Sequence, residues 1–429
     1  MSGHVVLGAG VAGLAVAHRA RELGAEVTLY EASATAGGLL DSFTVDGWRF
    51  DNGVHLSFAS EPEVRAVFDR TPYAEHEAAS LNWDDGRWLK HPVQNNMFPL
   101  PAEEKTALIA DFVARPEVDV RTYRDWLIHQ YGHAIAERWP LVYTRKYWTV
   151  DAGELGLDWI GNRMRRADVR EVLFGAMSPE APSTYYISRM RYPVQGGYRA
   201  FIEPLIEGAD IRTGHRATAL DWRARRIRFA NGAEISYDGL VNTIPLPVLI
   251  DIMTEVPDEI RADAASLFAS QVDLVSIGIA RPDVSPSLWF YIYDTDIMAA
   301  RVYSPSWKSA ANAPAGHSSL QFEIYSSPRN PQAATPEEMK ENCLAALETM
   351  GLARRDEVVL LHHKTLPYGN VVFDLGMEAR RDRVVDWVRG CGIELAGRFG
   401  EWAYLWSNQS FMSGRRAAEA MLRATGASS

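Results

Sequence analysis

The N-terminal pattern of hydrophobic and polar positions predicts a strand, a helix and a second strand in close succession. A short apolar run over residues 4–7 is typical of a buried parallel strand. An alanine-rich stretch with helical character follows and ends near Gly24. A second apolar run over residues 27–30 completes the unit. This order of elements predicts an α/β fold.

The period of the apolar positions then becomes that of a helix for a long stretch. Residues 60–190 are predicted to be mainly helical, with individual helices at 102–114 and 122–139. Trp126 and Trp139 recur at the spacing of one helix face, and we expect both in a hydrophobic core.

The remaining segments are largely of β type. Asp46-Gly47 and Asn231-Gly232 each lie between alternating apolar residues, which predicts β-hairpin turns. A helix is predicted from Tyr198 to about Glu207. Further strands are predicted at 211–213, 217–222, 227–229, 240–245, within 274–325, at 358–361 and at 393–396, and further helices at 336–350 and 408–424.

Composition limits the possible functions of the protein more than it limits the possible folds. The 429 residues carry 44 basic and 55 acidic side chains, and this net charge of −11 argues against a general binder of nucleic acids or anionic membranes. The two cysteines, Cys343 and Cys391, make neither a disulfide framework nor a metal-ligand spacing, so we expect free thiols and no metal. No apolar run reaches membrane-spanning length and no signal peptide precedes the first strand, so we expect a cytoplasmic protein.

The first candidate for chemistry is the glycine-rich turn between the first strand and the helix. Gly8, Gly10 and Gly13 form Gly-x-Gly-x-x-Gly, which allows a tight turn, close approach of a pyrophosphate and close helix–strand packing. Glu31 follows the second strand, at the position where an acid accepts a hydrogen bond from a ribose 2′-hydroxyl. These residues predict a dinucleotide site, and they leave NAD and FAD as alternatives.

The next segment distinguishes between NAD and FAD as the cofactor. Gly37-Gly38 follows Glu31, and the predicted hairpin then leads into Asp51-x-Gly-x-His55. This order resembles FAD proteins of the amine oxidase and UDP-galactopyranose mutase superfamily. The cofactor-binding residues that the resemblance implies are Gly8, Gly10, Ala12, Gly13, Glu31, Ala32, Gly37, Gly38, Leu39, His55, Gly397, Arg398, Asn408 and Gln409.

Four further segments are similar to the UDP-galactopyranose mutase family, and in particular to its eukaryotic-type branch. They are residues 91–96, 126–163, 289–305 with Asn312 and Pro314 beyond, and 397–409. The resemblance implies a GR2-type flavoprotein fold, which is a Rossmann-like FAD-binding domain with an inserted mainly helical domain and a β-sheet substrate domain. We place the discontinuous FAD-binding domain at 1–75, 195–245 and 385–429, the helical domain at 76–194 and the substrate domain at 246–384.

The resemblance also implies an unusual reaction. In that family N5 of reduced FAD attacks the anomeric carbon of a nucleotide-diphosphate sugar, and pyranose and furanose forms interconvert without net redox change. The implied catalytic residues are Arg163, Arg301 and His55, because two guanidinium groups suit a diphosphate and the histidine lies against the flavin. The implied substrate-binding residues are Gln94, Tyr143, Trp148, Arg398, Tyr404, Asn408 and Tyr368.

Alternatives remain for the residues and for the reaction. Surface ion pairs are the other reading of the arginines, and core packing is the other reading of Tyr143 and Trp148. Leu366-Pro367-Tyr368, His91 and Trp406 depart from the family pattern at substrate-facing positions, so the sugar or its nucleotide (UDP, dTDP or GDP) can differ from UDP-galactose. The competing functions are an FAD-dependent oxidoreductase of the amine oxidase or protoporphyrinogen oxidase type and an inactive FAD-bound protein. NADPH is a candidate reductant, and the sequence leaves an oligomer open.

Overall fold

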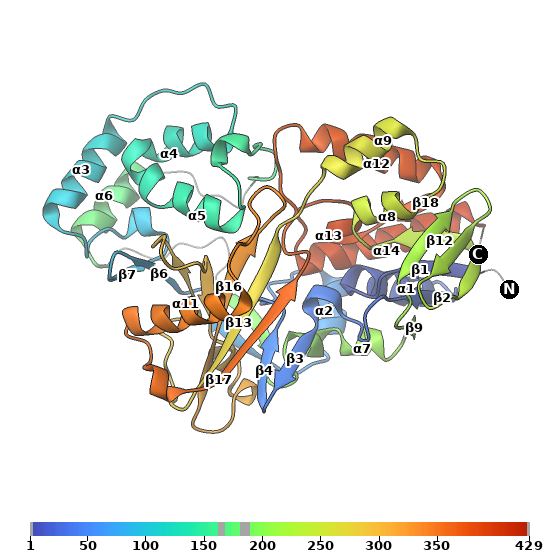
Figure 1. Cartoon of the computed structure of the whole chain (residues 1–429), viewed down its shortest axis with the longest axis horizontal. Helices are drawn as coiled ribbons and strands as arrows, with labels where there is room; N and C mark the ends of the chain where they lie inside the picture. Colours follow the sequence, from blue (N-terminus) through green and yellow to red (C-terminus); the bar gives the residue numbers. More distant parts are fainter. Residues whose placement is uncertain (1–2, 162–167, 181–188, 427–429) are drawn as a thin grey trace.

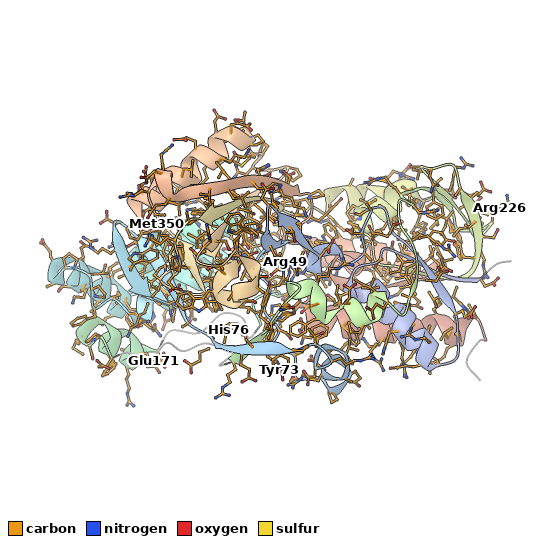
Figure 2. The ribbon with its side chains drawn as sticks, turned by 90° about the horizontal axis from the view of Figure 1, so that it is seen from below. Arg49, Tyr73, His76, Glu171, Arg226 and Met350 are labelled. Atoms are coloured by element: carbon orange, nitrogen blue, oxygen red, sulfur yellow. The ribbon has the colours of Figure 1, made fainter. Side chains whose placement is uncertain are left out.

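The computed structural model of the chain describes residues 3–161, 168–180 and 189–426, and it is built around two seven-stranded sheets (Figure 1). Figure 2 places Arg226 of the first sheet at one end of the molecule and Glu171 of the helical region towards the other. The second sheet lies between these two ends (Figure 1).

The first sheet contains the predicted N-terminal unit. Its strand order is β10-β11-β12-β1-β2-β9, with β18 also paired to β12. The strands β9, β2, β1, β12 and β18 run parallel, whereas β10, β11 and β12 form an antiparallel meander. Their bounds are β1 (Gly3–Leu7), β2 (Val27–Tyr30), β9 (Asp210–Arg212), β10 (Ala217–Asp221), β11 (Arg226–Phe229), β12 (Glu234–Asn242) and β18 (Ile393–Leu395).

Two helices beside this sheet bring the ends of the chain together. Helix α1 (Val11–Glu22) packs against α14 (Ser407–Ala424), and both termini lie at this end of the molecule (Figure 1). The helices approach closely at Gly414, because a Cβ there would stand 2.2 Å from the carbonyl oxygen of Ala12. A residue larger than glycine at this position would push the two helices apart.

The second sheet is mostly antiparallel. Its order is β17-β13-β16-β15-β14-β6-β7, and only the β14–β6 pair in it is parallel. Helix α11 (Pro336–Thr349) packs against β13 and β17. The strand bounds are β6 (Ser80–Asp84), β7 (Arg87–Lys90), β13 (Gln271–Ile279), β14 (Trp289–Ile292), β15 (Arg301–Tyr303), β16 (Ser318–Ser326) and β17 (Val358–Leu366).

A helical region adjoins the β6–β7 edge of the second sheet (Figure 1). It consists of α3 (Ala102–Val113), α4 (Tyr123–Arg138), α5 (Pro140–Tyr147) and α6 (Val169–Met177). Thr122 and Asp125 form a capping box that begins α4. Within α4, Gly132 has φ 75° where the helix kinks, and a Cβ there would stand 2.4 Å from a carboxylate oxygen of Asp111.

Two small antiparallel sheets of two strands each and several short helices connect these regions. The small sheets are β3 (Ser42–Val45) with β4 (Trp48–Asp51) and β5 (Tyr73–Glu77) with β8 (Arg189–Pro193). The connecting helices are α2 (Pro62–Phe68), α7 (Glu203–Ile206), α8 (Leu246–Ile252), α9 (Asp258–Ser266), α10 (Pro305–Lys308), α12 (Met377–Gly390) and α13 (Gly397–Gly400). In the described part of the chain, no helix is long and apolar enough to cross a membrane.

The predicted α/β fold is confirmed, and so are the long helices predicted at 102–114, 122–139, 336–350 and 408–424. The helix predicted from Tyr198 to Glu207 is wrong, because a 3-10 turn over Tyr198–Phe201 and the four-residue α7 replace it. Pro204 has no N–H for the carbonyl of Ala200, and that carbonyl accepts a hydrogen bond from the hydroxyl of Thr71 at 2.8 Å instead.

The predicted helical stretch of residues 60–190 also contains strands. Residues 80–90 form the β6–β7 hairpin, whose turn is Asp85-Gly86 with φ of 48° and 73°. Two positive φ values in succession are those of a type I′ turn, which Asp-Gly favours. Within the helical stretch proper, Trp139 is fully buried as expected, while Trp126 is only partly buried against the same core.

Candidate active site

The glycine-rich turn has the geometry of a pyrophosphate-binding loop. Gly8 has φ 98°, and a Cβ on Gly13 would stand 2.1 Å from the carbonyl oxygen of Gly8. Helix α1 begins at Gly10 with no side-chain cap and no acidic residue in its first turn. The first N–H groups of α1 and the positive end of its dipole are therefore directed at an anion site.

Glu31 lies beside this turn. One carboxylate oxygen accepts the backbone N–H of Ala9 at 2.9 Å, and the other accepts that of Ser33 at 2.8 Å. A carboxylate has about four acceptor positions, so two remain for ribose hydroxyls. The following segment runs close to the turn: the N–H of Gly37 donates to Ala9 at 2.8 Å, and a Cβ on Gly38 would approach Gly10 Cα to 3.3 Å. Ala32 is exposed beyond Glu31, and Leu39 lies in the 3-10 turn Gly38–Leu40.

The C-terminal segment meets the same turn. Gly397 has φ 81°, and a Cβ there would stand 2.7 Å from that of Ala12. At the start of α14, the amide of Asn408 donates to Glu61 at 2.7 Å. The side-chain oxygen of Gln409 accepts the N–H of Trp406 at 2.9 Å and so caps that helix. The structure therefore brings the predicted cofactor residues from both ends of the chain together.

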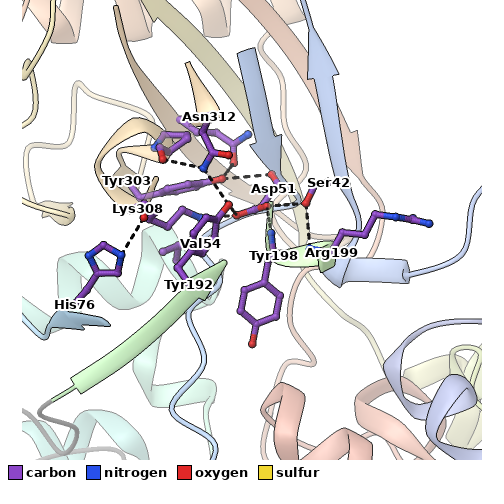
Figure 3. Close-up of polar contacts among 12 residues, drawn as sticks. Ser42, Asp51, Val54, His76, Tyr192, Tyr198, Arg199, Tyr303, Lys308 and Asn312 are labelled. Carbon is purple, nitrogen blue, oxygen red and sulfur yellow. Dashed lines mark hydrogen bonds and ion pairs between the residues drawn. The ribbon is translucent and has the colours of Figure 1, made fainter. Parts of the chain in front are cut away.

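The loop that leads to His55 starts at a buried carboxylate. Asp51 is 1% exposed, and one of its oxygens accepts the hydroxyl of Ser42 at 2.8 Å and the N–H of Tyr198 at 2.9 Å. The other accepts the hydroxyl of Tyr192 at 2.8 Å and the ammonium of Lys308 at 2.5 Å (Figure 3). Burial by itself would raise the pKa of Asp51, but Lys308 and these hydrogen bonds lower it below its ordinary value.

Lys308 is enclosed by aromatic rings. Its ammonium lies 4.3 Å from the ring centres of both Tyr192 and Tyr303, and its side chain is fully buried. Asn312 donates to the hydroxyl of Tyr192 at 3.1 Å and so orients that ring (Figure 3). A buried ammonium is stabilised here by one carboxylate and two aromatic faces.

His55 itself has an unsatisfied ring nitrogen. Its Nδ1 is buried and has no hydrogen-bond partner among the described residues, and its ring lies 5.3 Å from that of Tyr198. Burial is the main reason that the pKa of His55 is lowered to about 4; Asp51 opposes this shift, and the nearby cations Lys308 and Arg398 add to it. His55 is therefore neutral at pH 7, with one nitrogen available to a bound group.

Arg301 is held by a second buried carboxylate. Glu323 is 1% exposed, and one of its oxygens accepts both Arg301 Nε at 2.8 Å and Arg301 Nη2 at 2.6 Å. The hydroxyl of Tyr325 donates to the same oxygen at 2.7 Å. Burial by itself would lower the pKa of Arg301, but Glu323 raises it well above its ordinary value. The guanidinium is always charged, and its Nη1 makes no hydrogen bond to a described residue.

A row of aromatic rings connects Arg301 to Arg398. Arg301 lies 5.6 Å from the ring of Tyr147, which lies 5.1 Å from the ring of Trp148. Trp148 lies 5.5 Å from Tyr404, and Arg398 lies 5.5 Å from the ring of Tyr404. Residues from α5, β15 and the C-terminal segment thus meet at one place, although Trp148 is itself buried in a core.

Arg398 is bound through neutral groups. Its Nε donates to the carbonyl of Leu405 at 2.9 Å and its Nη1 to the side-chain oxygen of Asn370 at 3.0 Å. It makes no ion pair with a carboxylate of the described residues, so its positive charge is not neutralised within that part of the chain. Tyr368 lies near this segment, with its ring 5.5 Å from that of Phe399.

The other predicted substrate residues lie towards the helical region. Tyr143 is stacked at 5.4 Å on Tyr147, beside the aromatic row. The amide of Gln94 donates to the hydroxyl of Tyr131 at 3.3 Å, away from that row. Arg163 lies outside the described residues.

Three charged residues of this site, Asp51, Lys308 and Glu323, were not predicted as site residues. Asp51 belongs to the Asp-x-Gly-x-His motif, so a signal for it was present. Lys308 and Glu323 carry no local motif, because their partners Asp51 and Arg301 are 257 and 22 residues away in the sequence.

Together, the glycine turn, Glu31 and the His55 loop define a flavoprotein of the dinucleotide-binding α/β class. The model of the family "Flavin containing amine oxidoreductase" matches residues 11–422, and the chain belongs to that family. FAD is its cofactor. The residues present fit FAD, because the first N–H groups of α1 have no side-chain cap, Glu31 keeps acceptor positions beside the glycine turn, and the buried Nδ1 of His55 has no hydrogen-bond partner among the described residues.

Solved structures resemble this fold over its whole length. The structure of a reduced UDP-galactopyranose mutase covers 99% of this chain and 94% of its own, with a TM-score of 0.91 and 26% sequence identity. A protoporphyrinogen-oxidase-like protein from Exiguobacterium sp. 255-15 covers 98% of each chain, with a TM-score of 0.74 and 18% identity. The second likeness shows the fold alone.

Sequence relatives are similar over much shorter stretches. Protoporphyrinogen oxidase 2, chloroplastic/mitochondrial, of Arabidopsis thaliana is 41% identical over 64 residues. That stretch is 15% of this chain and 13% of the relative.

Proposed function

We propose that the protein is an FAD-dependent mutase that interconverts the pyranose and furanose forms of a nucleotide-diphosphate sugar. The observation that carries this proposal is the full-length similarity to reduced UDP-galactopyranose mutase, at a TM-score of 0.91, against 0.74 for the oxidase-like structure. The predicted departures at His91, Tyr368 and Trp406 leave the identity of the sugar and of the nucleotide to experiment.

The charges of the site support an anionic substrate. Arg301 keeps Nη1 available, and Arg398 has no carboxylate partner in the described part of the chain. Two guanidinium groups on one aromatic row suit the two phosphates of a nucleoside diphosphate, because each can bind phosphate oxygens with parallel N–H donors. An amine substrate would be repelled by the same groups.

The chain's own residues have separate tasks in this reaction. Arg301 and Arg398 would hold the diphosphate as it leaves the sugar, and Tyr143 would line the cleft beside them. His55 would contact the cofactor through its neutral ring, since its lowered pKa keeps it uncharged at pH 7. Reduced FAD, when bound, supplies the nucleophilic nitrogen for the anomeric carbon.

A second candidate function is an FAD-dependent oxidase. The curated relative of 41% identity over 64 residues is an oxidase, which favours this alternative for the matched stretch. An oxidase and a mutase differ in one measurable respect, because only the oxidase transfers electrons from substrate to oxidised flavin.

The test is an anaerobic incubation of dithionite-reduced holoprotein with UDP-galactopyranose, and in parallel with dTDP- and GDP-hexoses, followed by chromatography of ring-size isomers. We expect one of these sugars to isomerise. Arg301→Gln should lower kcat/KM about 100-fold or more, because it removes a charge that stabilises the leaving diphosphate. The matched control is Arg383→Gln, which breaks only an exposed pair with Asp263 and should keep full activity.

The opposite outcome is equally specific. If none of these sugars isomerises, and an amine or another substrate reduces the oxidised flavin stoichiometrically, the oxidase candidate replaces the mutase.

A further inference from the structure

Glu323 divides its two carboxylate oxygens between two parts of the site. One oxygen accepts the backbone N–H of Val54 at 2.8 Å. The other accepts two N–H groups of Arg301, at 2.8 and 2.6 Å. The side chain is 1% exposed, so solvent does not compete for either oxygen.

The Val54 side of this bridge belongs to the loop that carries His55. That loop is held at two further points, because Lys364 of β17 donates to Asn52 at 2.8 Å and Lys308 at the end of α10 pairs with Asp51 at 2.5 Å. At Gly53 the loop lies so close that a Cβ there would stand 3.2 Å from the Glu323 oxygen. The carboxylate therefore determines where the backbone next to His55 lies.

The Arg301 side of the bridge is the proposed diphosphate contact. Among the described residues, the side-chain hydrogen bonds of Arg301 go to Glu323 and Tyr325 alone. When an anion binds at Nη1, the guanidinium shares its charge between the anion and Glu323. The carboxylate then carries more negative charge towards Val54, and its plane shifts with the guanidinium.

We propose that Glu323 is a positioning residue that couples anion binding at Arg301 to the position of the His55 loop, and through it to the redox state of the flavin. The proposal rests on the proposed function in one respect, which is that the anion is a nucleoside diphosphate. Coupling is reciprocal, so a flavin whose reduction moves the loop must also change the affinity of the anion site.

The probe is UDP, and the measured quantity is the ratio of its Kd values for oxidised and dithionite-reduced holoprotein. In the wild-type protein we expect a ratio within the range of about 5- to 150-fold that is typical of coupled sites. Glu323→Gln should bring the ratio to within twofold of one. The amide places an acceptor oxygen on one side and an NH2 group on the other, so it can serve Val54 or Arg301 but not both.

A second variant separates geometry from charge. Glu323→Asp keeps the carboxylate, but its side chain is one methylene shorter and cannot span Val54 and Arg301. The ratio of the two UDP Kd values should therefore also approach one in this variant. It provides the test even if Glu323→Gln fails to fold. The matched control is Asp273→Asn on the neighbouring strand β13. Asp273 is buried and bonded to His363 and Thr365, and it touches neither the loop nor Arg301. The ratio of the two UDP Kd values in Asp273→Asn should therefore remain that of the wild type.

Each outcome decides between the two proposals. A wild-type ratio of one, or a wild-type ratio retained in both Glu323 variants, overturns the coupling and leaves the mutase function standing. UDP binding with the expected ratios, but without isomerisation of any nucleotide sugar, overturns the mutase function and leaves the coupling. If UDP binds to neither redox form of the wild type, and dTDP and GDP measured in the same way do not bind either, both proposals are overturned.

Discussion

The cofactor side and the substrate side of the site are built by different means. On the cofactor side, backbone groups form the candidate site: the glycine turn at Gly8–Gly13 and the first N–H groups of α1, beside which Glu31 is held by the amides of Ala9 and Ser33. The proposed substrate side depends instead on side chains from distant parts of the sequence: the buried pair Arg301–Glu323 holds the proposed anion contact, and the buried pair Asp51–Lys308 holds the loop that leads to His55.

The difference lies in what each side tolerates. A backbone-built site is limited by space, because an added Cβ can meet another backbone atom, as one on Gly13 would meet the carbonyl oxygen of Gly8. A site of buried charges is limited by pairing, because the loss of one partner leaves the other charged and desolvated. The first kind fails by a clash, and the second fails by an unpaired charge.

The largest expected effect is at Gly13. Alanine in a helix normally stabilises it relative to glycine by roughly 0.5–1 kcal/mol. At Gly13 the sign should reverse, because the new Cβ would stand 2.1 Å from the carbonyl oxygen of Gly8. We therefore expect Gly13→Ala to destabilise the protein strongly. The thermal unfolding midpoint measures this loss of stability.

Gly10→Ala is the matched control for that clash. A Cβ on Gly10 meets nothing within 4 Å in the chain itself. The apoprotein should therefore unfold near the wild-type temperature, while the flavin absorbance per protein falls because the pyrophosphate needs that space. A Gly13→Ala protein as stable as the wild type would contradict the steric account.

The next largest effect is at Lys308. Lys308→Met leaves Asp51 charged and without its cation in a fully buried place, which should cost about 3–5 kcal/mol of unfolding free energy. The double variant with Asp51→Asn should recover part of that loss, since no unpaired charge remains. Urea unfolding of the apoproteins measures both.

The control is a lysine in an exposed pair. Lys340 lies 3.5 Å from Glu337, whose side chain is 77% exposed. Lys340→Met should therefore change the unfolding free energy by about 0–1 kcal/mol. Equal losses in the two lysine variants would show that burial does not distinguish the two pairs.

The same difference explains what the sequence could predict. The glycine turn, Glu31 and the Asp46-Gly47 hairpin are local patterns whose spacing carries their geometry, and the structure has them where expected. The Asp85-Gly86 hairpin has an equally local signal, but it lies within a stretch of mainly helical pattern and was assigned to it.

The side-chain pairs had no comparable signal. Nothing near Lys308 indicates that it is buried, because its burial is stabilised by Asp51, 257 residues away. Glu323 reads as one polar position in a β-type run, and only the register of β15 against β16 places it opposite Arg301. The helix predicted from Tyr198 failed for a local reason, since Pro204 removes an N–H and Thr71 binds the carbonyl it would have used.

The last expected effect is a pH dependence of stability that comes from two buried histidines, and each contributes gradually over the titration range. Burial lowers the pKa of His55 and that of His91 to about 4. Both are below the value of 6.5 in the unfolded chain. As pH falls from about 6.5 towards 4, the unfolded state takes up protons that the folded state does not, so stability is full above pH 6.5 and declines below it.

The slope of the unfolding free energy against pH should approach about 1 kcal/mol per pH unit for each such histidine. Urea unfolding between pH 7.5 and 4.5 measures this slope. His91→Gln tests one contribution without touching His55. In the wild-type protein, Nδ1 of His91 lies 3.1 Å from the side-chain oxygen of Asn82. The amide of glutamine at position 91 can donate to that oxygen in place of the imidazole. The variant should lose the His91 share of the slope and keep that of His55, whereas an unchanged slope would mean that His91 takes up its proton equally in both states.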